Sequence, residues 1–473
     1  MRKRFLSLFI VSCMVLLATA QGKAKYVFYF IGDGMGVNQV NCTETYLAAI
    51  EGRIGISPLC FTQFPTAGLV TTYSATNGVT DSAAGGVALA TGEKTKNGAL
   101  GMKADLTTNL NSIASMAKAQ GKAVGIATSV SVDHATPGAF YAHVKDRNMY
   151  HRIGKDLVEA GFDFYAGSDF LHPEDKEQSG EKNLYTQCHE AGYTLARGYA
   201  DYRKKAAKAK KMLLLQSETA SRNDRSSLPY AIDRDKNDLT LQDITRAGIH
   251  FLSSKQSDGF FLMIEGGKID WACHSNDAAT MCKEVMDMDN AVKVAYEFYA
   301  QHPDETLIVI TADHETGGIA LGTGKYELHT DVLKYQQKSV AAFSKMIAEQ
   351  HKKEGKKFTW DFVRKQLQTH FGFWKQVPLD DKETAMLKKA YDDFCEGVAK
   401  DTRTLYQSEN VIARTAKTLI NKKAMIGWQS GGHSNGYVPV FAIGVGAELF
   451  SGRIDNTDIP RKIASIAGYD GGM

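Results

Sequence analysis

The chain has 473 residues, of which 43% are hydrophobic and 23% are charged. This composition is typical of a globular protein with a substantial core and excludes disorder over most of the length. The formal net charge of +3 is accounted for by Arg2, Lys3 and Arg4, since residues 1–20 contain no acidic side chain. The remainder is close to neutral, so we expect no nucleic-acid-specific binding and no general attraction to anionic membranes.

Residues 1–20 are predicted to form a cleaved signal peptide. A basic start precedes the apolar run 5–18, which ends in Ala18-Thr19-Ala20, the small-x-small pattern of a cleavage site. A membrane anchor needs about 20 apolar residues, and a lipoprotein signal at Cys13 would leave too short an apolar core. We expect a secreted, periplasmic protein with no anchor after cleavage, although a signal peptide does not distinguish the periplasm from the medium.

The cysteines that remain after cleavage give no metal-binding pattern. They are Cys42, Cys60, Cys188, Cys273, Cys282 and Cys395. Export permits disulfides, but the sequence specifies no pairing. None of these residues belongs to a Cys-x-x-Cys pair, so we expect no thiolate zinc site.

Beyond the signal, apolar runs typical of buried strands alternate with helical stretches such as 109–121. The strand candidates are 25–32, 123–129, 162–167, 210–217, 260–266, 306–313 and 438–446. This alternation predicts an α/β fold with a doubly wound, largely parallel central sheet flanked by helices. We expect residues 21–473 to form a single α/β domain.

Two stretches interrupt this alternation. Residues of about 170–245 are polar and charge-rich, and about 325–425 is a Lys-, Glu- and Gln-rich segment with few strand signals. We interpret 325–425 as a helix-rich insertion. It would overhang the functional site, form a subunit interface, or be a solvated helical decoration.

Polar side chains occupy the turns that follow the predicted strands or precede a helix. They are Asp33, Ser82, His134, Glu265, Asp313 and His433. Because α/β sheets bind ligands beyond the carboxyl ends of their strands, we expect these groups to converge on one site. Carboxylates and histidines of this number are typical of a site for several metal ions.

The first two turns are weak signals when each is taken alone. Asp33 lies between glycines directly after a strand, where a helix N-cap is the simpler interpretation; the spacing is not GxGxxG, and a carboxylate would repel pyrophosphate. Ser82 begins a helical stretch, where the dipole and free amides favour negative charge. No GxSxG elbow surrounds Ser82, so metal coordination is the activation we expect.

The later turns supply metal ligands. Asp270 and His274 lie at i and i+4, so they share one helix face. Glu265 ends an apolar strand, where a carboxylate requires a partner or a cation. Asp313 and His314 follow another such strand as neighbours, and a glycine-rich turn carries His433.

In this order, the motifs resemble those of the alkaline phosphatase family, from about residue 25 to about residue 445. The strings that carry the resemblance are DGMG, TDSAA, HATPGAFYAHVKDR, EGGKID with the downstream His274, TADH and GGH. One such string is weak evidence, whereas all of them in series are specific.

The resemblance implies a metal-dependent hydrolase of phosphate monoesters in which Ser82 forms a phosphoserine, Arg147 binds the phosphate and Asp81 orients Arg147. It also implies two zinc ions and one magnesium ion per subunit. The implied ligands are Asp33, Ser82, Asp313 and His314 for the zinc on the nucleophile side; Asp270, His274 and His433 for the zinc on the leaving-group side; and Asp33, Thr136 and Glu265, with His134, for the third ion.

Two positions depart from the best-known bacterial pattern, which has Asp in place of His134 and Lys in place of Trp271. A neutral imidazole makes the third site less anionic, so zinc or cobalt would compete there with magnesium. Without a lysine beside the phosphate we expect weaker inhibition by phosphate. The alternative is that Trp271 only packs beneath the site.

Two successive displacements predict net retention of configuration at phosphorus. The need to deprotonate serine and water predicts activity that rises toward alkaline pH.

The alternative functions are a phosphodiesterase or related hydrolase of the same superfamily, and a non-enzymatic phosphate- or metal-binding protein. A homodimer is implied by the resemblance alone. The sequence does not indicate which phosphomonoester is the physiological substrate.

Overall fold

The computed structural model describes residues 23–175 and 181–469. The predicted signal peptide, residues 1–20, lies outside these ranges. Within the described ranges, no helix combines the length and the apolar character needed to cross a membrane.

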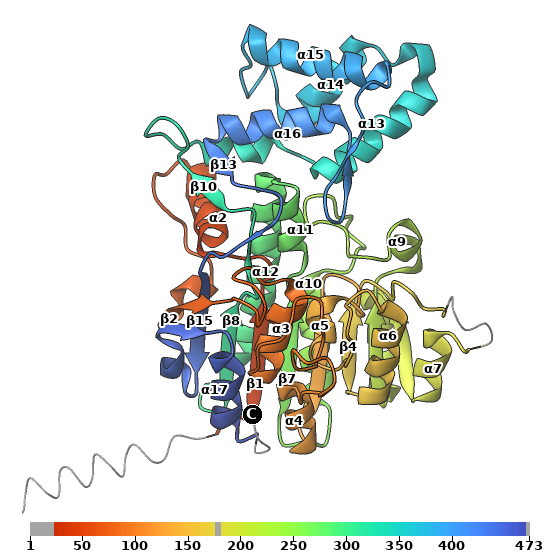
Figure 1. Ribbon diagram of the computed structural model, residues 1–473, viewed down its shortest axis with the longest axis vertical. Coiled ribbons are helices and arrows are strands. Elements are labelled where there is room, and N and C mark those ends of the chain that lie inside the picture. Colours follow the sequence, from red (N-terminus) through yellow and green to blue (C-terminus); the bar gives the residue numbers. More distant parts are fainter. Residues whose placement is uncertain (1–22, 176–180, 470–473) are drawn as a thin grey trace, which may run out of the picture.

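A ten-stranded sheet forms the centre of the molecule (Figure 1). In spatial order its strands are β16 (Gly452–Asp455), β2 (Thr66–Thr71), β15 (Val438–Gly444), β8 (Thr306–Thr311), β1 (Tyr26–Ile31), β7 (Phe260–Glu265), β3 (Ala123–Thr128), β4 (Phe164–Gly167), β6 (Lys211–Leu215) and β5 (Tyr193–Arg197). Within this sheet β15 is antiparallel to β2 and β8, and the other pairings are parallel. The predicted α/β class and largely parallel sheet are confirmed.

Each of the predicted strand candidates is a strand of this sheet, but β2, β5 and β16 were not predicted. The sequence missed them because none of the three is a continuous apolar run. All three lie at or near the edges of the sheet and are only partly buried. Strands in such positions carry polar side chains and lack the pattern of a central strand.

Helices cover both faces of the sheet. In chain order, the α-helices of the described ranges are α2 (Val37–Ile50), α3 (Ser82–Thr91), α4 (Ile113–Ala119), α5 (Ala135–Gly138), α6 (Tyr150–Ala160), α7 (Leu184–Glu190), α8 (Tyr199–Lys205), α9 (Glu218–Asn223), α10 (Leu241–Ser253), α11 (Lys268–His274), α12 (Ala278–Tyr299), α13 (Val340–Glu354), α14 (Trp360–Phe371), α15 (Asp381–Cys395), α16 (Val411–Lys423) and α17 (Asp458–Ala467), of which α13 to α16 lie away from the sheet. In Figure 1, α3, α4 and α17 lie in front of the sheet, whereas α10 and α12 pack against each other behind it.

The register of the central strands aligns their carboxyl ends. Ile31 of β1 lies beside Thr311 of β8 and Glu265 of β7, and Glu265 lies beside Thr128 of β3. The turns that follow therefore start from one line across the sheet. This alignment places the residues after β1, β7, β3 and β8 around a common point.

Helix α3 packs unusually close to the turn after β8. Its N-cap, Asp81, accepts a hydrogen bond from the backbone N–H of Ala84. A Cβ atom added at Gly85 would lie 2.9 Å from the backbone oxygen of Asp313. Glycine at this position lets the start of α3, and with it Ser82, approach the turn.

Residues 325–425, called the cap below, contain α13 to α16 and lie beyond the carboxyl edge of the sheet (Figure 1). The chain enters and leaves the cap region through β10 (Ile319–Leu321) and β13 (Ile426–Trp428), which pair antiparallel. A second short pair, β9 (Glu315–Thr316) and β14 (His433–Ser434), lies nearer the sheet. The cap thus rises from the part of the chain that connects Asp313 with His433.

The close approach of α3 gives a stability prediction. We expect Gly85→Ala to lower the free energy of unfolding by about 1–3 kcal/mol despite the better helix propensity of alanine, because the methyl group would push α3 away from Asp313. Gly78→Ala is the control, since its Cβ would have no heavy atom closer than 3.8 Å. Urea unfolding of both variants measures the effect, and equal stability would contradict this close packing.

Candidate functional site

Ser82 lies at the centre of the gathered residues. It is the first residue of α3 and is fully buried, and its Oγ lies 3.2 Å from Nε2 of His314. The start of a helix favours negative charge on the serine oxygen. The serine therefore faces the histidine of the turn after β8 from the positive end of α3.

One ligand set surrounds this histidine. Nε2 of His314 lies 3.3 Å from Oδ1 of Asp33 and 3.4 Å from Oδ2 of Asp313, and all three side chains are fully buried. The backbone N–H of Gly34 donates to the other oxygen of Asp313 at 3.3 Å. Together with Ser82, these are the residues predicted for the zinc on the nucleophile side.

A second set adjoins the first. Oδ2 of Asp270 lies 3.2 Å from Nε2 of His274, and the same His274 nitrogen lies 3.2 Å from Nε2 of His433. The outer ring nitrogens are fixed by backbone carbonyls, since Nδ1 of His274 contacts the Gly431 oxygen at 2.6 Å and Nδ1 of His433 contacts the Thr80 oxygen at 2.9 Å. Backbone contacts of this kind orient histidines for metal binding through the other nitrogen.

His314 connects the two sets. Its ring stacks on that of His433 with centroids 3.6 Å apart, and one ligand atom each from Asp270, His314 and His433 lies within 4.8 Å of the others. Thr316 also joins the sets, because its hydroxyl donates to Oδ1 of Asp270 at 2.6 Å and contacts Nδ1 of His314 at 3.2 Å. Sequence reasoning missed Thr316, which lies two residues after the quoted TADH string.

The third predicted set lies on the other side of Asp33. One ligand atom each from Asp33, His134 and Glu265 lies within 4.8 Å of the others. The Thr136 hydroxyl donates to Oδ2 of Asp33 at 3.5 Å, and the Thr128 hydroxyl donates to Glu265. His134 is the N-cap of α5, so its side chain and that of Thr136 leave the same short helix start.

Unpaired buried atoms at the site fit bound cations. Among the described residues, these atoms are buried without a hydrogen-bond partner: one carboxylate oxygen each of Asp33, Glu265, Asp270 and Asp313, and both ring nitrogens of His134. Buried carboxylates are costly unless they are paired or coordinate a metal. Several such oxygens beside neutral imidazoles form a donor set for divalent ions such as zinc and magnesium.

The pKa shifts have the same origin. Burial, followed by the charge of Asp313, raises the pKa of Asp33 well above its usual range, and burial raises the pKa of Glu265 to about 7. Burial lowers the pKa of His134 to about 3 and that of His314 well below its usual range. Without cations, carboxylates here tend to hold protons while these two histidines stay neutral.

Arg147 enters the site from the loop before α6. Its Nη1 donates to Oδ2 of Asp81 at 3.1 Å, and the backbone N–H of Gly98 donates to both oxygens of Asp81 at 3.1 Å. The guanidinium is therefore oriented by the residue that caps α3. Arg147 and Ser82 are thus tied to the same helix start.

The cap contributes an aromatic side chain that sequence reasoning missed. The Tyr406 ring stacks on Trp271 with centroids 4.3 Å apart and planes 12° apart. Lys268, also missed, is buried with its Nζ 4.9 Å from the Trp271 ring and 2.7 Å from the Ser227 hydroxyl. Tyr406 lies in a stretch without a motif, whereas Lys268 lies within the quoted EGGKID string.

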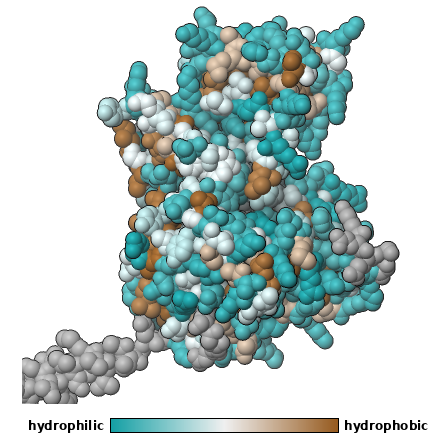
Figure 2. Space-filling model, in the orientation of Figure 1, coloured by the Kyte–Doolittle hydropathy of each residue, from teal (hydrophilic) through white to brown (hydrophobic). Residues whose placement is uncertain are grey.

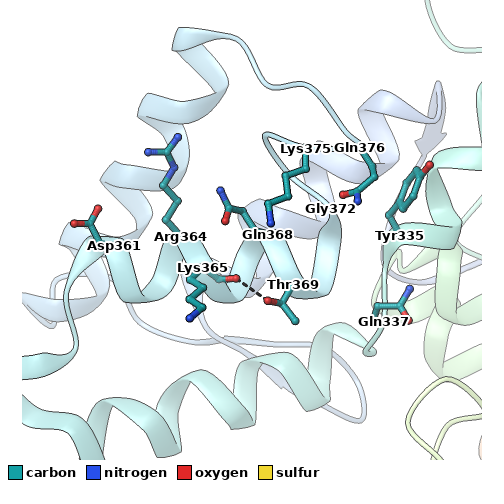
Figure 3. A pocket seen from close by; sticks show the side chains of 10 residues that line it. All are labelled: Tyr335, Gln337, Asp361, Arg364, Lys365, Gln368, Thr369, Gly372, Lys375 and Gln376. Atoms are coloured by element: carbon teal, nitrogen blue, oxygen red, sulfur yellow. Dashed lines mark hydrogen bonds between the residues drawn. The ribbon is translucent and has the colours of Figure 1, made fainter.

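Of two large cavities, one borders the candidate site and the other does not. One of about 1110 Å³ borders the site, because Lys268, Trp271 and Tyr406 form part of its wall. Another of about 710 Å³ lies in the cap, where Arg364, Gln368 and other residues of α14 line it together with Tyr335 (Figure 3). None of the predicted site residues lines the cavity in the cap.

Comparison with known proteins places the chain among phosphatases. The family model for alkaline phosphatase matches residues 24–469. Alkaline phosphatase 3 of Bacillus subtilis is 33% identical over 95% of this chain and 90% of its own length. Alkaline phosphatase 4 of the same organism is 31% identical with the same coverage of both chains.

Solved structures agree with the sequence comparisons. The cold-active alkaline phosphatase of a Shewanella species has a TM-score of 0.77 and is 30% identical, covering 93% of this chain and 99% of its own. The enzyme from the Antarctic bacterium TAB5 has a TM-score of 0.66 and is 25% identical, covering 95% and 100%; its histidine-to-aspartate variant has magnesium bound in the M3 site. The chain therefore belongs to the alkaline phosphatase family, a family of phosphomonoester hydrolases.

Proposed function

We propose that this protein is an exported, metal-dependent alkaline phosphatase that hydrolyses phosphate monoesters through a phosphoserine at Ser82. The observation that carries the proposal is the position of Ser82: its Oγ lies at the start of α3, 3.2 Å from His314, within a cluster of buried carboxylates and histidines. Arg147 is oriented toward the same helix start by Asp81. Nucleophile, cation ligands and phosphate-binding group thus share one location.

The residues suit three cations. We assign one zinc to Asp33, Asp313, His314 and Ser82, a second zinc to Asp270, His274 and His433, and a third ion, magnesium or another divalent metal, to Asp33, Thr136, Glu265 and His134. When bound, such ions supply positive charge that favours the ionised serine and the departing oxygen. The identity of the third ion stays open because this chain has His134 where the best-known bacterial pattern has an aspartate.

The chain's own residues define the sequence of events. The planar guanidinium of Arg147 binds two phosphoryl oxygens, and Asp81 holds it in that orientation. The Ser82 hydroxyl gives up its proton and its Oγ forms a bond to phosphorus while the bond from phosphorus to the ester oxygen breaks; the departing oxygen takes up a proton and leaves as the alcohol. Water then attacks the phosphoserine, which releases phosphate and restores the serine hydroxyl with net retention at phosphorus.

His314 is not a free general base in this scheme. Its Nε2 faces two carboxylates as well as Ser82, at 3.2 to 3.4 Å. Groups that converge on one point in this way share a cation rather than a proton. The contact between Ser82 and His314 therefore supports metal coordination of both side chains.

Simple turnover measurements distinguish the alternative functions. Turnover of p-nitrophenyl phosphate separates an enzyme from a non-enzymatic phosphate- or metal-binding protein, and a comparison with bis-p-nitrophenyl phosphate separates a phosphomonoesterase from a phosphodiesterase. The cavity of about 1110 Å³ beside Trp271 offers space for a leaving group. Its polar wall supports a broad range of small phosphomonoesters rather than one defined substrate.

Replacement of the serine tests the mechanism. We expect Ser82→Ala to lower turnover of p-nitrophenyl phosphate by about three orders of magnitude or more at alkaline pH, because the nucleophile is lost. Acid-quenched wild type should carry labelled phosphate that the variant lacks. Ser253→Ala, at the exposed end of α10, is the control and should match the wild type. Substantial turnover by Ser82→Ala would contradict the phosphoserine route.

Metal binding should depend on pH. Burial raises the pKa of Glu265 to about 7 and also raises the pKa values of Asp33 and Asp313, so bound cations must displace protons from these groups at lower pH. His134 and His314 are neutral and do not compete in this way. We therefore expect metal affinity to fall about tenfold or more per pH unit below about pH 7.

Competition with a chromogenic chelator, after removal of bound metal, measures this dependence between about pH 5.5 and about pH 8.5. Glu265→Gln replaces one titrating carboxyl group with an amide of similar shape. It should flatten the pH dependence of the affinity for the third ion. An affinity for metal that does not change across this pH range would contradict the assignment of these carboxylates as ligands.

We further propose that residues 1–20 direct export of the protein. We also propose that two copies of the chain associate as a dimer. The segment from Val37 to Ile56 exposes apolar side chains, with Ile54 fully exposed and Ile56 49% exposed. Figure 2 shows hydrophobic residues gathered along the flank beside α2 and β10, on an otherwise largely hydrophilic face. Exposed apolar groups of this kind are typical of subunit interfaces.

Sedimentation equilibrium tests the dimer. We expect the mass of two chains for the wild type and of one chain for the double variant Ile54→Glu, Ile56→Glu, because the charges would be buried at the interface. Val398→Glu alters a side chain that is 67% exposed in the cap and is the matched control. A monomeric wild type, or a dimer that persists in the double variant, would contradict this interface.

A further inference from the structure

A hairpin of the cap reaches the phosphate-binding arginine. Between α15 and α16, β11 (Thr402–Arg403) and β12 (Ser408–Glu409) pair antiparallel, and the loop containing them extends from the cap toward the sheet (Figure 1). The backbone N–H of Thr404 donates to the backbone oxygen of Gln407 at 2.8 Å and closes the turn. Tyr406 lies in this turn.

The Tyr406 side chain is surrounded by residues of the site. Its hydroxyl oxygen accepts a hydrogen bond from Nη2 of Arg147 at 3.4 Å. Its ring stacks on Trp271 at 4.3 Å and lies 5.8 Å from the His134 ring and 5.6 Å from the His274 ring. The position of the phenol is therefore fixed by ring contacts, and only the oxygen is directed at the guanidinium.

The hairpin is anchored on both sides of this tyrosine. The Gln407 side chain contacts the Tyr230 hydroxyl and accepts a hydrogen bond from the Ser275 hydroxyl at 3.2 Å. Glu409 forms a buried ion pair of 2.6 Å with Lys417 of α16. The hairpin is thus held both to Tyr230 and Ser275, outside the cap, and to α16 of the cap.

We propose that Tyr406 is a positioning residue for Arg147, through which the cap sets the affinity of the site for a phosphoryl group. The guanidinium is held at both terminal nitrogens, by Asp81 at Nη1 and by Tyr406 at Nη2. Each terminal nitrogen carries two N–H groups, so one on each remains to bind a phosphoryl oxygen. A guanidinium held at both ends loses less freedom when phosphate binds, which strengthens binding.

This inference rests on the proposed function and deepens it, and a double-mutant cycle tests it with inorganic phosphate as the probe. The zinc-loaded wild type, Tyr406→Phe, Arg147→Ala and the double variant are titrated with phosphate by calorimetry. We expect Tyr406→Phe, which keeps the stack on Trp271, to weaken phosphate binding about 5- to 20-fold and to raise KM similarly with little change in kcat. In the Arg147→Ala background the same change should cost less than about twofold.

Tyr391→Phe is the matched control, because it removes a phenol oxygen from the same cap, where that hydroxyl donates to the Phe358 backbone oxygen at 3.0 Å; phosphate affinity should stay that of the wild type. Gln407→Ala, which loosens the hairpin without touching Arg147, should weaken phosphate about 2- to 5-fold and keeps the test valid if Tyr406→Phe does not fold.

Unchanged phosphate affinity in Tyr406→Phe, or an equal loss with and without Arg147, would overturn the role of Tyr406. A wild type that binds phosphate without hydrolysing esters would overturn the proposed function instead. The cycle of dissociation constants would still decide how Tyr406 acts, since it does not depend on turnover.

Discussion

The carboxyl groups of Asp33 and Asp313 lie buried within 3.4 Å of the same histidine nitrogen, and Asp270 adjoins them through His433. Like charges this close, removed from water, repel one another strongly in a medium of low dielectric constant. Either protons or cations must offset that repulsion. The surrounding fold holds these groups together in spite of the repulsion, and the same arrangement of charges would favour a bound cation.

The register of the parallel strands brings these carboxyl groups close together. β8, β1 and β7 end on one line, so the turns after them project Asp313, Asp33 and Glu265 toward one point without long loops. The core, built from strands that are buried along all or nearly all of their length, fixes the distance between the turns. Gly85 in α3 then lets Ser82 approach the cluster closely, where a larger side chain at residue 85 would hold α3 away.

The sequence predicted the parts of the site that are tied to the sheet. Asp33, Glu265 and Asp313 each follow a long apolar run, so the strand pattern alone placed them at one edge, and motif spacing added Asp270 with His274. Edge strands such as β5 escaped prediction because partial burial leaves no apolar run.

Tyr406 could not be predicted for a different reason. Its position depends on how the cap packs over the sheet, and neither the local composition nor a motif around residue 406 reports that contact. Lys268 is similar, since a lysine in a glycine-rich turn is ordinarily solvated, and its burial beside Trp271 and Tyr230 results from tertiary packing.

The strands at the base of the cap have a consequence for how such proteins diversify. β10 and β13 pair with each other where the chain enters and leaves the cap, and the pair β9–β14 holds Thr316 opposite His433. The ladder fixes the two ends of the inserted segment at a constant separation. A cap of different length or helix content would therefore leave the spacing of His314 and His433 unchanged, so new surfaces could be added above an unaltered cluster of buried carboxylates and histidines.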